Sequence, residues 1–434
     1  MTKQAELTNV ADIILLDGVN KSKTKLIIAA SVGNFLEIFD FIVYSFFSGI
    51  IGHVFFNSDD PLTSLLISVS VFGVGFVMRP VGSIVIGSFA DRHGRKTAML
   101  VTIVIMALGS AVIGFAPPFS AIGIAAPLLI VFGRLLQGFS AGGEVGASTT
   151  LLMESAKRHQ RGFFVSWQFF GQGLSTLSGS LLAAFLMSYL SPEALESWGW
   201  RVPFWLALAI IPVGLYIRSH ISETYDTSAI KHINEHPFKI LVTKHLRQAL
   251  LGMLFIFPGT VMMYTLVFFM PNYLMTVTEI EKSTTFLISS YASVIVIIFT
   301  FISGFLCDRL ELRKKMAIVI LAIAFVATFF EYAFVHTFAV FISFHTIAVG
   351  CLGLMMTFST LIIIEAFAKN IRATAVAVIY AFGVSIFGGT AQPIVTYLLK
   401  ASGRNIMSPF WYLSLSLVVG AIALMLFNEK RYSD

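Results

Sequence analysis

Long apolar runs, separated by short polar segments, occupy almost the whole chain. Each run ends at glycines, prolines or charged residues and has about the length of a membrane-spanning helix, which needs roughly 20 apolar residues. The runs cover residues 26–52, 63–89, 98–116, 121–150, 163–188, 201–218, 248–276, 285–307, 316–335, 338–366, 373–400 and 408–427. The pattern therefore predicts an all-α membrane protein with twelve transmembrane helices.

The composition excludes a water-soluble globule. Of the 434 residues, 57% are hydrophobic and only 12% are charged, whereas soluble domains carry about 25% charged residues. The net charge of +6 is spread over short loops, so we expect no nucleic-acid partner. Cys307 and Cys351 both lie in apolar runs, which offers neither a disulfide framework nor a metal-ligand spacing. We expect no cofactor and no enzymatic activity.

The basic residues alternate between the two sides of the predicted membrane. The tails and every second loop hold 23 Lys and Arg residues, and the other loops hold only Arg201, Lys282, Lys400 and Arg404. Loops rich in Lys and Arg stay in the cytoplasm. Both termini are therefore expected to be cytoplasmic, and the polar segment 1–25 lacks the pattern of a cleaved signal peptide.

A polar, basic segment at 219–247 divides the chain into two sets of six spans, 26–218 and 248–427, between cytoplasmic tails at 1–25 and 428–434. The two halves share internal echoes. Gly87–Lys96 resembles Gly304–Lys315, and Glu154 with Arg161 is echoed by Glu365 with Arg372. Paired helical halves with a binding site between them are typical of alternating-access transporters.

The run Gly-x-x-x-Asp-Arg-x-Gly-Arg-Lys at Gly87–Lys96 resembles the signature loop of the major facilitator superfamily. Within that superfamily, four segments resemble the metabolite:proton symporter family: Gly33–Phe41, Gly75–Gly82, Gly133–Glu144 and Trp198–Phe204. The resemblance implies the major facilitator fold of two pseudo-symmetric six-helix bundles, a proton gradient as energy source and a place in the bacterial inner membrane. The family includes carriers of citrate, tricarballylate, 2-oxoglutarate, shikimate and zwitterionic osmolytes, and the citrate and tricarballylate carriers are the most similar.

Four charged residues stand out inside predicted spans: Glu37, Asp40, Arg79 and Arg134. Counting 1.5 Å per residue from the ends of the runs places Glu37, Asp40 and Arg79 about midway through a 30 Å core. Glu37 and Asp40 share one helix face, which Tyr44 extends by a turn. Charges at that depth need partners and are functional candidates by default.

The fourth predicted span carries Arg134, Gln137 and Glu144 along one stripe of an otherwise apolar helix, so this stripe is expected to face protein or water. Further polar residues lie at helical depth in other spans: Gln168, Gln172, Tyr264, Tyr380 and Gln392.

These residues suggest a division of roles. The planar guanidinium group of arginine matches the geometry of a carboxylate and stays charged when buried. Arg79 and Arg134 are therefore candidate ligands of an anionic substrate. Gln137, Tyr44 and the other polar residues are expected to surround that substrate. Asp40, Glu37 and Glu144 are candidate proton-coupling groups, because a substrate that competes for an arginine couples its binding to protonation of an acid. The alternative is that the buried pairs only hold spans together.

The resemblance also implies a gate in the loops between helices. Its residues would be Asp91, Arg92, Gly94, Arg95 and Lys96 in the first half, with Asp308 and Arg309 in the second. The second copy has one inserted residue and lacks the glycine. Acids and arginines that such gates use would be Glu154, Arg161, Glu365 and Arg372.

The sequence thus predicts a proton symporter that imports a small organic anion such as a di- or tricarboxylate, and that acts as a monomer in the lipid bilayer. A symporter of a zwitterionic osmolyte or of a shikimate-like monocarboxylate is the alternative. A drug:proton antiporter is less favoured, because the fifth span lacks the Gly-Pro pattern of such exporters. We do not expect an ATP-driven pump, which would need a phosphate-binding loop, or a receptor, which would need a signalling domain.

Overall fold

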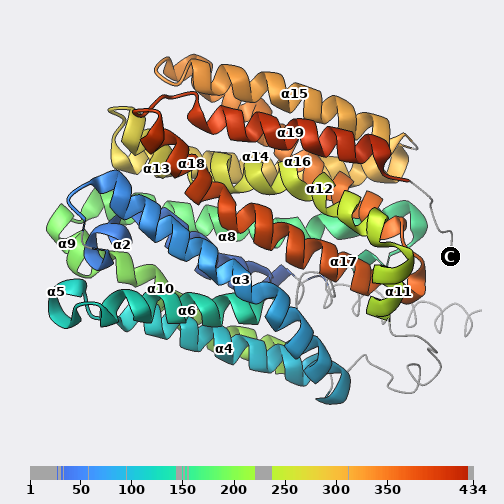
Figure 1. Cartoon of the computed structure of the whole chain (residues 1–434), viewed down its shortest axis with the longest axis horizontal. Helices are drawn as coiled ribbons and strands as arrows, with labels where there is room; N and C mark the ends of the chain where they lie inside the picture. The colour runs from blue at the N-terminus through green and yellow to red at the C-terminus, as the bar shows by residue number, and fades with distance from the viewer. Residues whose placement is uncertain are drawn as a thin grey trace, which may run out of the picture.

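The computed structural model describes most of the chain as two groups of long, nearly parallel helices (Figure 1). The described residues are 27, 31–32, 34–56, 58–93, 95–142, 149, 152–153, 156–219, 237–310 and 312–428. Over these residues the secondary structure is helical, with no strand. The helices of the first half lie on one side of the molecule and those of the second half on the other, as the predicted fold class requires.

The first half begins with a bent helix pair, Asn34–Phe46 and α2 (Ser48–Phe55), whose axes differ by 63°. The elements that follow are α3 (Pro61–His93), α4 (Arg95–Phe115), α5 (Phe119–Ile122), α6 (Ala125–Ala141), η1 (Arg158–Gln160), α8 (Arg161–Tyr189), α9 (Pro192–Ser197), η2 (Gly199–Arg201) and α10 (Val202–Ser219).

The second half repeats this order of long helices. Its elements are α11 (Pro237–Lys244), α12 (Leu246–Met262), η4 (Met263–Phe268), α13 (Met270–Val277), α14 (Lys282–Arg309), α15 (Arg313–Ala333), α16 (Phe338–Glu365), α17 (Lys369–Gly383), η5 (Val384–Gly388), α18 (Gly389–Ala401) and α19 (Ser408–Leu426). Both η4 and η5 are wide π-helical turns within a longer span.

The predicted spans are confirmed. Eight described helices are long and apolar enough to cross a membrane, and the bent pair at the start makes nine. The helices α4, α6 and α10 occupy the places expected for the third, fourth and sixth spans, which completes the twelve-helix order. The segment 219–247, expected as a loop, contains the short helix α11; residues 220–236 and the tails at 1–25 and 429–434 lie outside the described residues.

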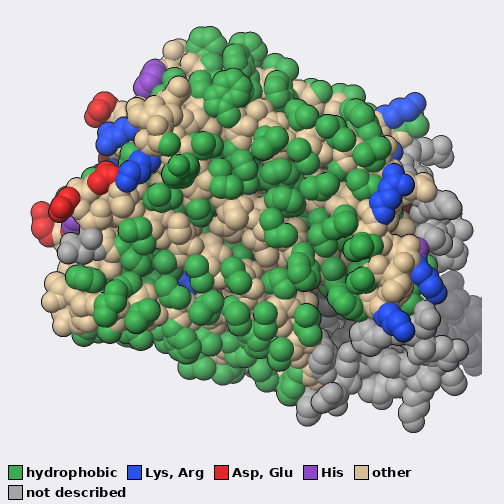
Figure 2. Space-filling model, in the orientation of Figure 1, with side chains coloured by type: hydrophobic (Ala, Val, Ile, Leu, Met, Phe, Trp, Pro, Cys, Tyr) green, Lys and Arg blue, Asp and Glu red, His purple; other side chains and the backbone are tan. Residues whose placement is uncertain are grey.

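The two ends of the helix bundle differ in charge (Figure 2). At one end, here termed the basic end, α8 begins at Arg161, α14 ends at Arg309 and α15 begins at Arg313. The opposite, acidic end carries Asp60 before α3 and Glu193 in α9. In Figure 2 the acidic side chains gather at this second end.

Glycines let α3 and α6 pack backbone to backbone. A Cβ atom at Gly138 would lie 1.6 Å from the carbonyl oxygen of Gly75, and one at Gly142 would lie 2.1 Å from that of Arg79. Such distances leave no room for any side chain. The contact brings the backbones that carry Arg79 and Arg134 together, so it positions both guanidinium groups.

Hydrogen bonds between the halves close the acidic end around Ser45. The Asn272 amide donates to the Ser45 carbonyl oxygen over 3.0 Å, and the Gln392 amide donates to the Ser45 hydroxyl over 2.6 Å. The first helix bends directly after this residue. Nearer the surface, the Lys400 ammonium lies 3.0 Å from the Asp60 carboxylate and donates to the Thr63 hydroxyl.

Replacing Gly138 with alanine is expected to lower the stability of the folded protein by about 1–3 kcal/mol, because the added methyl group forces α3 and α6 apart. Gly259→Ala is the matched control, because a Cβ atom at Gly259 meets nothing within 4 Å. Thermal unfolding of the two purified variants tests this. Equal melting temperatures would contradict the backbone contact.

The Asp60–Lys400 pair is expected to restrain opening of the acidic end at every pH between 5 and 8. The hydrogen bond from Thr63 and the contact with Lys400 lower the pKa of Asp60 from 3.8 to about 2. Because the folded pKa is the lower one, the stabilisation is complete above about pH 4 and is lost only as the pH falls toward 2.

Asp60→Asn should therefore speed maleimide labelling of a cysteine placed at the buried Thr396 about 2- to 5-fold, equally at pH 5 and pH 8, which is the range for a surface ion pair. Glu279→Gln, at an exposed acid of the same end without a described partner, should change nothing. A rate increase seen only at pH 8 would show that Asp60 titrates in this range and would contradict its lowered pKa.

Candidate functional site

A cavity lies between the two halves, from about mid-depth toward the basic end. It contains about 780 Å³ of empty space, including its mouth. Its described lining residues come from both halves: Asn34, Ile38, Arg79, Ala141, Gly142, Gln168, Phe169, Gln172, Thr260, Met263, Tyr264, Met356, Ala377, Tyr380, Ala381 and Val384. A site that both halves share is where alternating access requires the substrate to bind.

Arg79 and Glu37 form an ion pair at the wall of this cavity. Arg79 Nη2 lies 3.6 Å from Glu37 Oε1, and the two residues are only 5% and 3% exposed. The guanidinium also lies over the rings of Phe41 and Phe76, 4.5 Å from each centroid. Within the described residues, Arg79 Nε and Nη2 have no hydrogen-bond acceptor, so this arginine retains donors for a ligand.

Arg134 lies behind the cavity wall and is not among the lining residues. It is fully buried, and its Nη1 donates to Gln137 Oε1 over 2.7 Å while Nη2 donates to the Phe72 carbonyl oxygen over 3.3 Å. The rings of Phe41, Tyr44 and Phe72 cover the guanidinium at 4.5, 4.8 and 4.9 Å. Among its donors, Nε has no acceptor among the described residues, and the two terminal nitrogens are bound to protein groups.

Asp40 accompanies Arg134 as Glu37 accompanies Arg79. It lies beside Ser110 and within electrostatic reach of Arg134, and Gln137 Nε2 donates to the same Ser110 hydroxyl over 3.0 Å. The first helix therefore carries two acids, one turn apart, that face different arginines. The Phe41 ring contacts both guanidinium groups.

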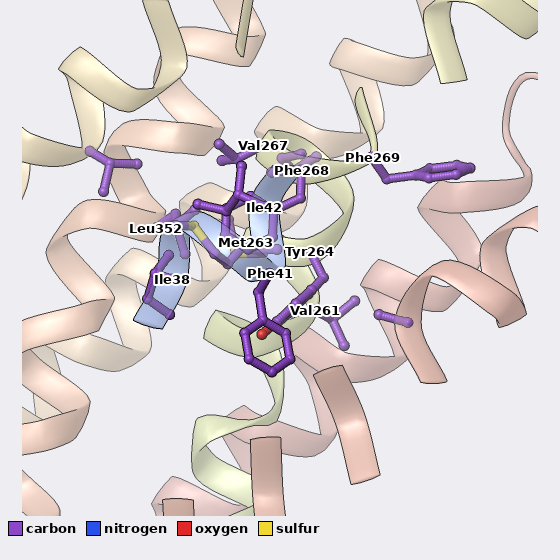
Figure 3. Close-up of a cluster of buried hydrophobic side chains, with 14 of the residues drawn as sticks. Ile38, Phe41, Ile42, Val261, Met263, Tyr264, Val267, Phe268, Phe269 and Leu352 are labelled. Carbon is purple, nitrogen blue, oxygen red and sulfur yellow. The ribbon is translucent and has the colours of Figure 1, made fainter. Parts of the chain in front are cut away.

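An aromatic cluster separates the cavity from the acidic end. Tyr264 contacts Phe72, Phe76 and Phe268, with ring centroids 6.0, 5.5 and 5.1 Å away. Figure 3 shows Ile38, Phe41 and Ile42 of the first helix facing the segment that includes Met263, Tyr264, Val267 and Phe268. The cluster joins both halves, because Phe72 and Phe76 belong to α3 and Tyr264 and Phe268 to η4.

The other residues predicted to bind substrate divide into two groups. Gln168, Gln172, Tyr264 and Tyr380 line the cavity. Tyr44 and Gln392 do not line it: the Tyr44 hydroxyl donates to the Ser68 carbonyl oxygen over 3.3 Å, and Gln392 bonds to Ser45 in the closed acidic end. Periodicity alone did not indicate which face of each helix is turned toward the cavity.

At the basic end, predicted gate residues connect the halves. Asp308 accepts the backbone N–H groups of Gly162 and Phe163 at the start of α8, over 2.7 and 2.9 Å. The Glu365 carboxylate lies 4.0 Å from Arg161 and accepts a 2.6 Å hydrogen bond from Arg313.

The remaining gate predictions are placed differently. Arg372 donates from Nε to the Phe367 carbonyl oxygen over 3.2 Å, and Arg309 lies over the Phe305 ring at 3.9 Å. Three further predictions, Gly94, Glu144 and Glu154, lie outside the described residues, as do the side chains of Asp91, Arg92, Arg95 and Lys96.

Sequence reasoning missed several polar residues at these sites. Asn34 and Thr260 line the cavity, Arg313 binds Glu365, and Asp60 binds Lys400. Arg313 lies in the second copy of the signature loop, Gly304–Lys315, of which only Asp308 and Arg309 were named as gate residues. Asp60 precedes α3 and Lys400 lies in the last turn of α18, so only their meeting in space identifies them.

No metal centre is found among the described residues, which contain no group of three or more His, Cys, Asp and Glu side chains able to hold an ion. The buried His345 bonds through Nδ1 to Glu331 over 2.8 Å, between α16 and α15. This pair lies toward the acidic end, apart from the cavity lining.

Comparison with known proteins places the chain among transporters. The family model described as Major Facilitator Superfamily matches residues 30–391. The alpha-ketoglutarate permease of Escherichia coli K12 is 32% identical over 98% of both chains, and the citrate-proton symporter of Klebsiella pneumoniae is 29% identical over 96% of this chain and 94% of its own. A proline/betaine transporter of Salmonella typhimurium is also 29% identical, over 97% of this chain and 86% of its own.

Among solved structures, the xylose transporter from E. coli superposes with a TM-score of 0.75 at 17% identity, over 94% of this chain and 98% of the other. That likeness concerns the fold. Together with the sequence matches over nearly the full length, it agrees with the twelve-helix fold. The chain belongs to the major facilitator superfamily and fits its metabolite:proton symporters, so it is a transporter and not an enzyme.

Proposed function

We propose that this protein imports a small organic acid together with protons by alternating access. The observation that carries the proposal is the Glu37–Arg79 ion pair at the wall of the central cavity. Arg79 is a carboxylate ligand that stays charged at this depth, and Glu37 is an acid able to give or take a proton beside it. The relatives named for citrate and alpha-ketoglutarate transport support an acidic substrate.

The proposed coupling is an exchange of partners on Arg79. In the empty carrier the Glu37 carboxylate balances the guanidinium charge. When Glu37 takes up a proton, it no longer balances this charge, and a substrate carboxylate replaces Glu37 beside Arg79. Release of the substrate then requires that Glu37 lose its proton and return, because an unpaired guanidinium at this depth costs several kcal/mol. Binding of one partner is thereby linked to binding of the other.

Asp40 and Arg134 are assigned a supporting place in this cycle. Their groups are enclosed by Gln137, Ser110 and the rings around Phe41, so they contact the substrate only if the wall rearranges. Because Phe41 touches both arginines, movement of the first helix on protonation of Glu37 changes the surroundings of Arg134 as well. Asp40 is therefore a second candidate proton site.

The orientation of the protein in the membrane is proposed from the charge of its two ends. We propose that the basic end faces the cytoplasm of a bacterial cell, in its inner membrane, as the distribution of Lys and Arg favours. The cavity then lies nearer the inner side, with the outer side closed at Ser45 and at Asp60–Lys400. Asp308 and Glu365 are the proposed inner gate, and one chain contains a complete site.

A zwitterionic osmolyte or a shikimate-like monocarboxylate is the second candidate substrate. The relative named for proline and betaine transport supports the zwitterionic osmolyte. A cationic drug is disfavoured, because no acidic side chain is among the described residues that line the cavity.

Collapse of the proton gradient should abolish accumulation of the substrate. Glu37→Gln, which keeps the shape of the side chain but cannot exchange a proton, should reduce concentrative uptake at least about 10-fold while leaving substrate counterflow measurable, because exchange needs the site but no net proton transfer. Uptake of labelled organic acids into cells and into proteoliposomes measures both. Glu196→Gln, at an exposed acid outside the cavity, is the control.

Two results would contradict this coupling. One is accumulation against the concentration gradient that persists after a protonophore is added. The other is a Glu37→Gln variant that accumulates substrate as well as the parent protein.

The proposed orientation is tested by single cysteines. The native Cys307 and Cys351 are buried, so an impermeant maleimide should react mainly with introduced residues. A cysteine at the exposed Asp59, on the acidic end, should be labelled in intact cells, and one at the exposed Thr243 in α11 only after permeabilisation. The reverse pattern would exclude cytoplasmic termini.

A further inference from the structure

The charge inventory of the cavity restricts the substrate. Among the described lining residues, Arg79 is the only one with a charged side chain, and most of the others are apolar or small. Its charge is already balanced by Glu37 in the empty carrier. Partner exchange on Arg79 therefore neutralises one carboxylate and no more.

No second described arginine lines the cavity. Arg134 is fully buried behind aromatic rings and donates to Gln137 and Phe72. At the basic end, Arg161 and Arg313 both face Glu365. A second carboxylate in the cavity would thus be a desolvated charge without a partner, which costs several kcal/mol.

The cavity does offer neutral hydrogen-bonding groups. The side chains of Gln172 on α8 and Thr260 on α12 line it from opposite halves and make no hydrogen bond to any other described residue. A free amide can donate and accept, and so can a hydroxyl. They suit a substrate that carries hydroxyl, carbonyl or amide groups besides its carboxylate, and such a ligand would bridge the two halves.

We infer that the substrate is a small monocarboxylate with neutral polar groups, bound by Arg79 through its carboxylate and by Gln172 and Thr260 through those groups. The inference rests on the proposed function and narrows it: it favours a hydroxylated or amide-bearing monoacid over the di- and tricarboxylates that the sequence suggested. A lone carboxylate carried with one proton also leaves the charge of the cavity unchanged.

The test compares pairs of ligands of similar size, in which one member has a single carboxylate and the other has more. Titration calorimetry on the full chain in lipid nanodiscs at pH 7.5, where all these acids are ionised, would compare glutarate with its monoamide, 2-oxoglutarate with its 5-amide, and citrate with quinate. In each pair that binds, the monoanion should bind at least about 10-fold more tightly, since the other member brings at least one unpaired charge.

A variant with a second cation in the cavity tests the same inference by changing the protein instead of the ligand. Gln172→Lys adds a second cation to the cavity and should raise dicarboxylate affinity about 10-fold without improving that of the monoanions, whereas Gln172→Met, of similar length and neutral, should not. If Gln172→Lys fails to fold, Thr260→Lys places the cation on the opposite wall.

The outcomes separate the two claims. Tight binding and protonophore-sensitive uptake of citrate or 2-oxoglutarate by the parent protein would overturn the monocarboxylate inference and leave the proposed symport intact. A lysine variant that gains equally for mono- and dianions would also overturn it. If no carboxylate of either charge binds, the proposed function fails and the inference fails with it.

Discussion

The cost of keeping two arginines charged inside apolar helices governs this structure. An uncompensated charge at such depth costs several kcal/mol, and Arg79 and Arg134 are 5% and 0% exposed. On the first helix, Glu37 pairs with Arg79, Asp40 one turn away lies within electrostatic reach of Arg134, and the Phe41 ring contacts both guanidinium groups. The position of the first helix against α3 and α6 is thus set by electrostatics as much as by packing.

Small residues make that arrangement possible. Because Gly138 and Gly142 let α6 approach the backbone of α3, the two arginines lie close together although they repel each other. The same packing separates their roles: Arg79 reaches the cavity, while Arg134 is held by Gln137 and the Phe72 carbonyl. One arginine is available to a ligand because the other is engaged in holding the wall.

Much of the fold could be predicted from apolar runs, because each helix must cross the same thickness of bilayer. The last span, expected at 408–427, is observed at Ser408–Leu426, and counting residues placed Glu37 and Arg79 at matching depths. Depth alone did not tell which arginine faces the cavity, because rotation of a helix about its axis depends on its neighbours. The bend after Ser45 and the Asp60–Lys400 pair arise from contacts between distant segments, which a periodic pattern does not contain.

The paired charges of the first helix also bear on how the membrane voltage acts on the carrier. Moving one elementary charge through 100 mV changes the free energy by about 2.3 kcal/mol. With Glu37 opposite Arg79, this pair carries no net charge in the empty carrier, and a monoanion that enters with one proton leaves the charge unchanged. In the proposed cycle one turnover then moves no net charge across the membrane, and the pH difference alone, not the voltage, sets how far the substrate accumulates.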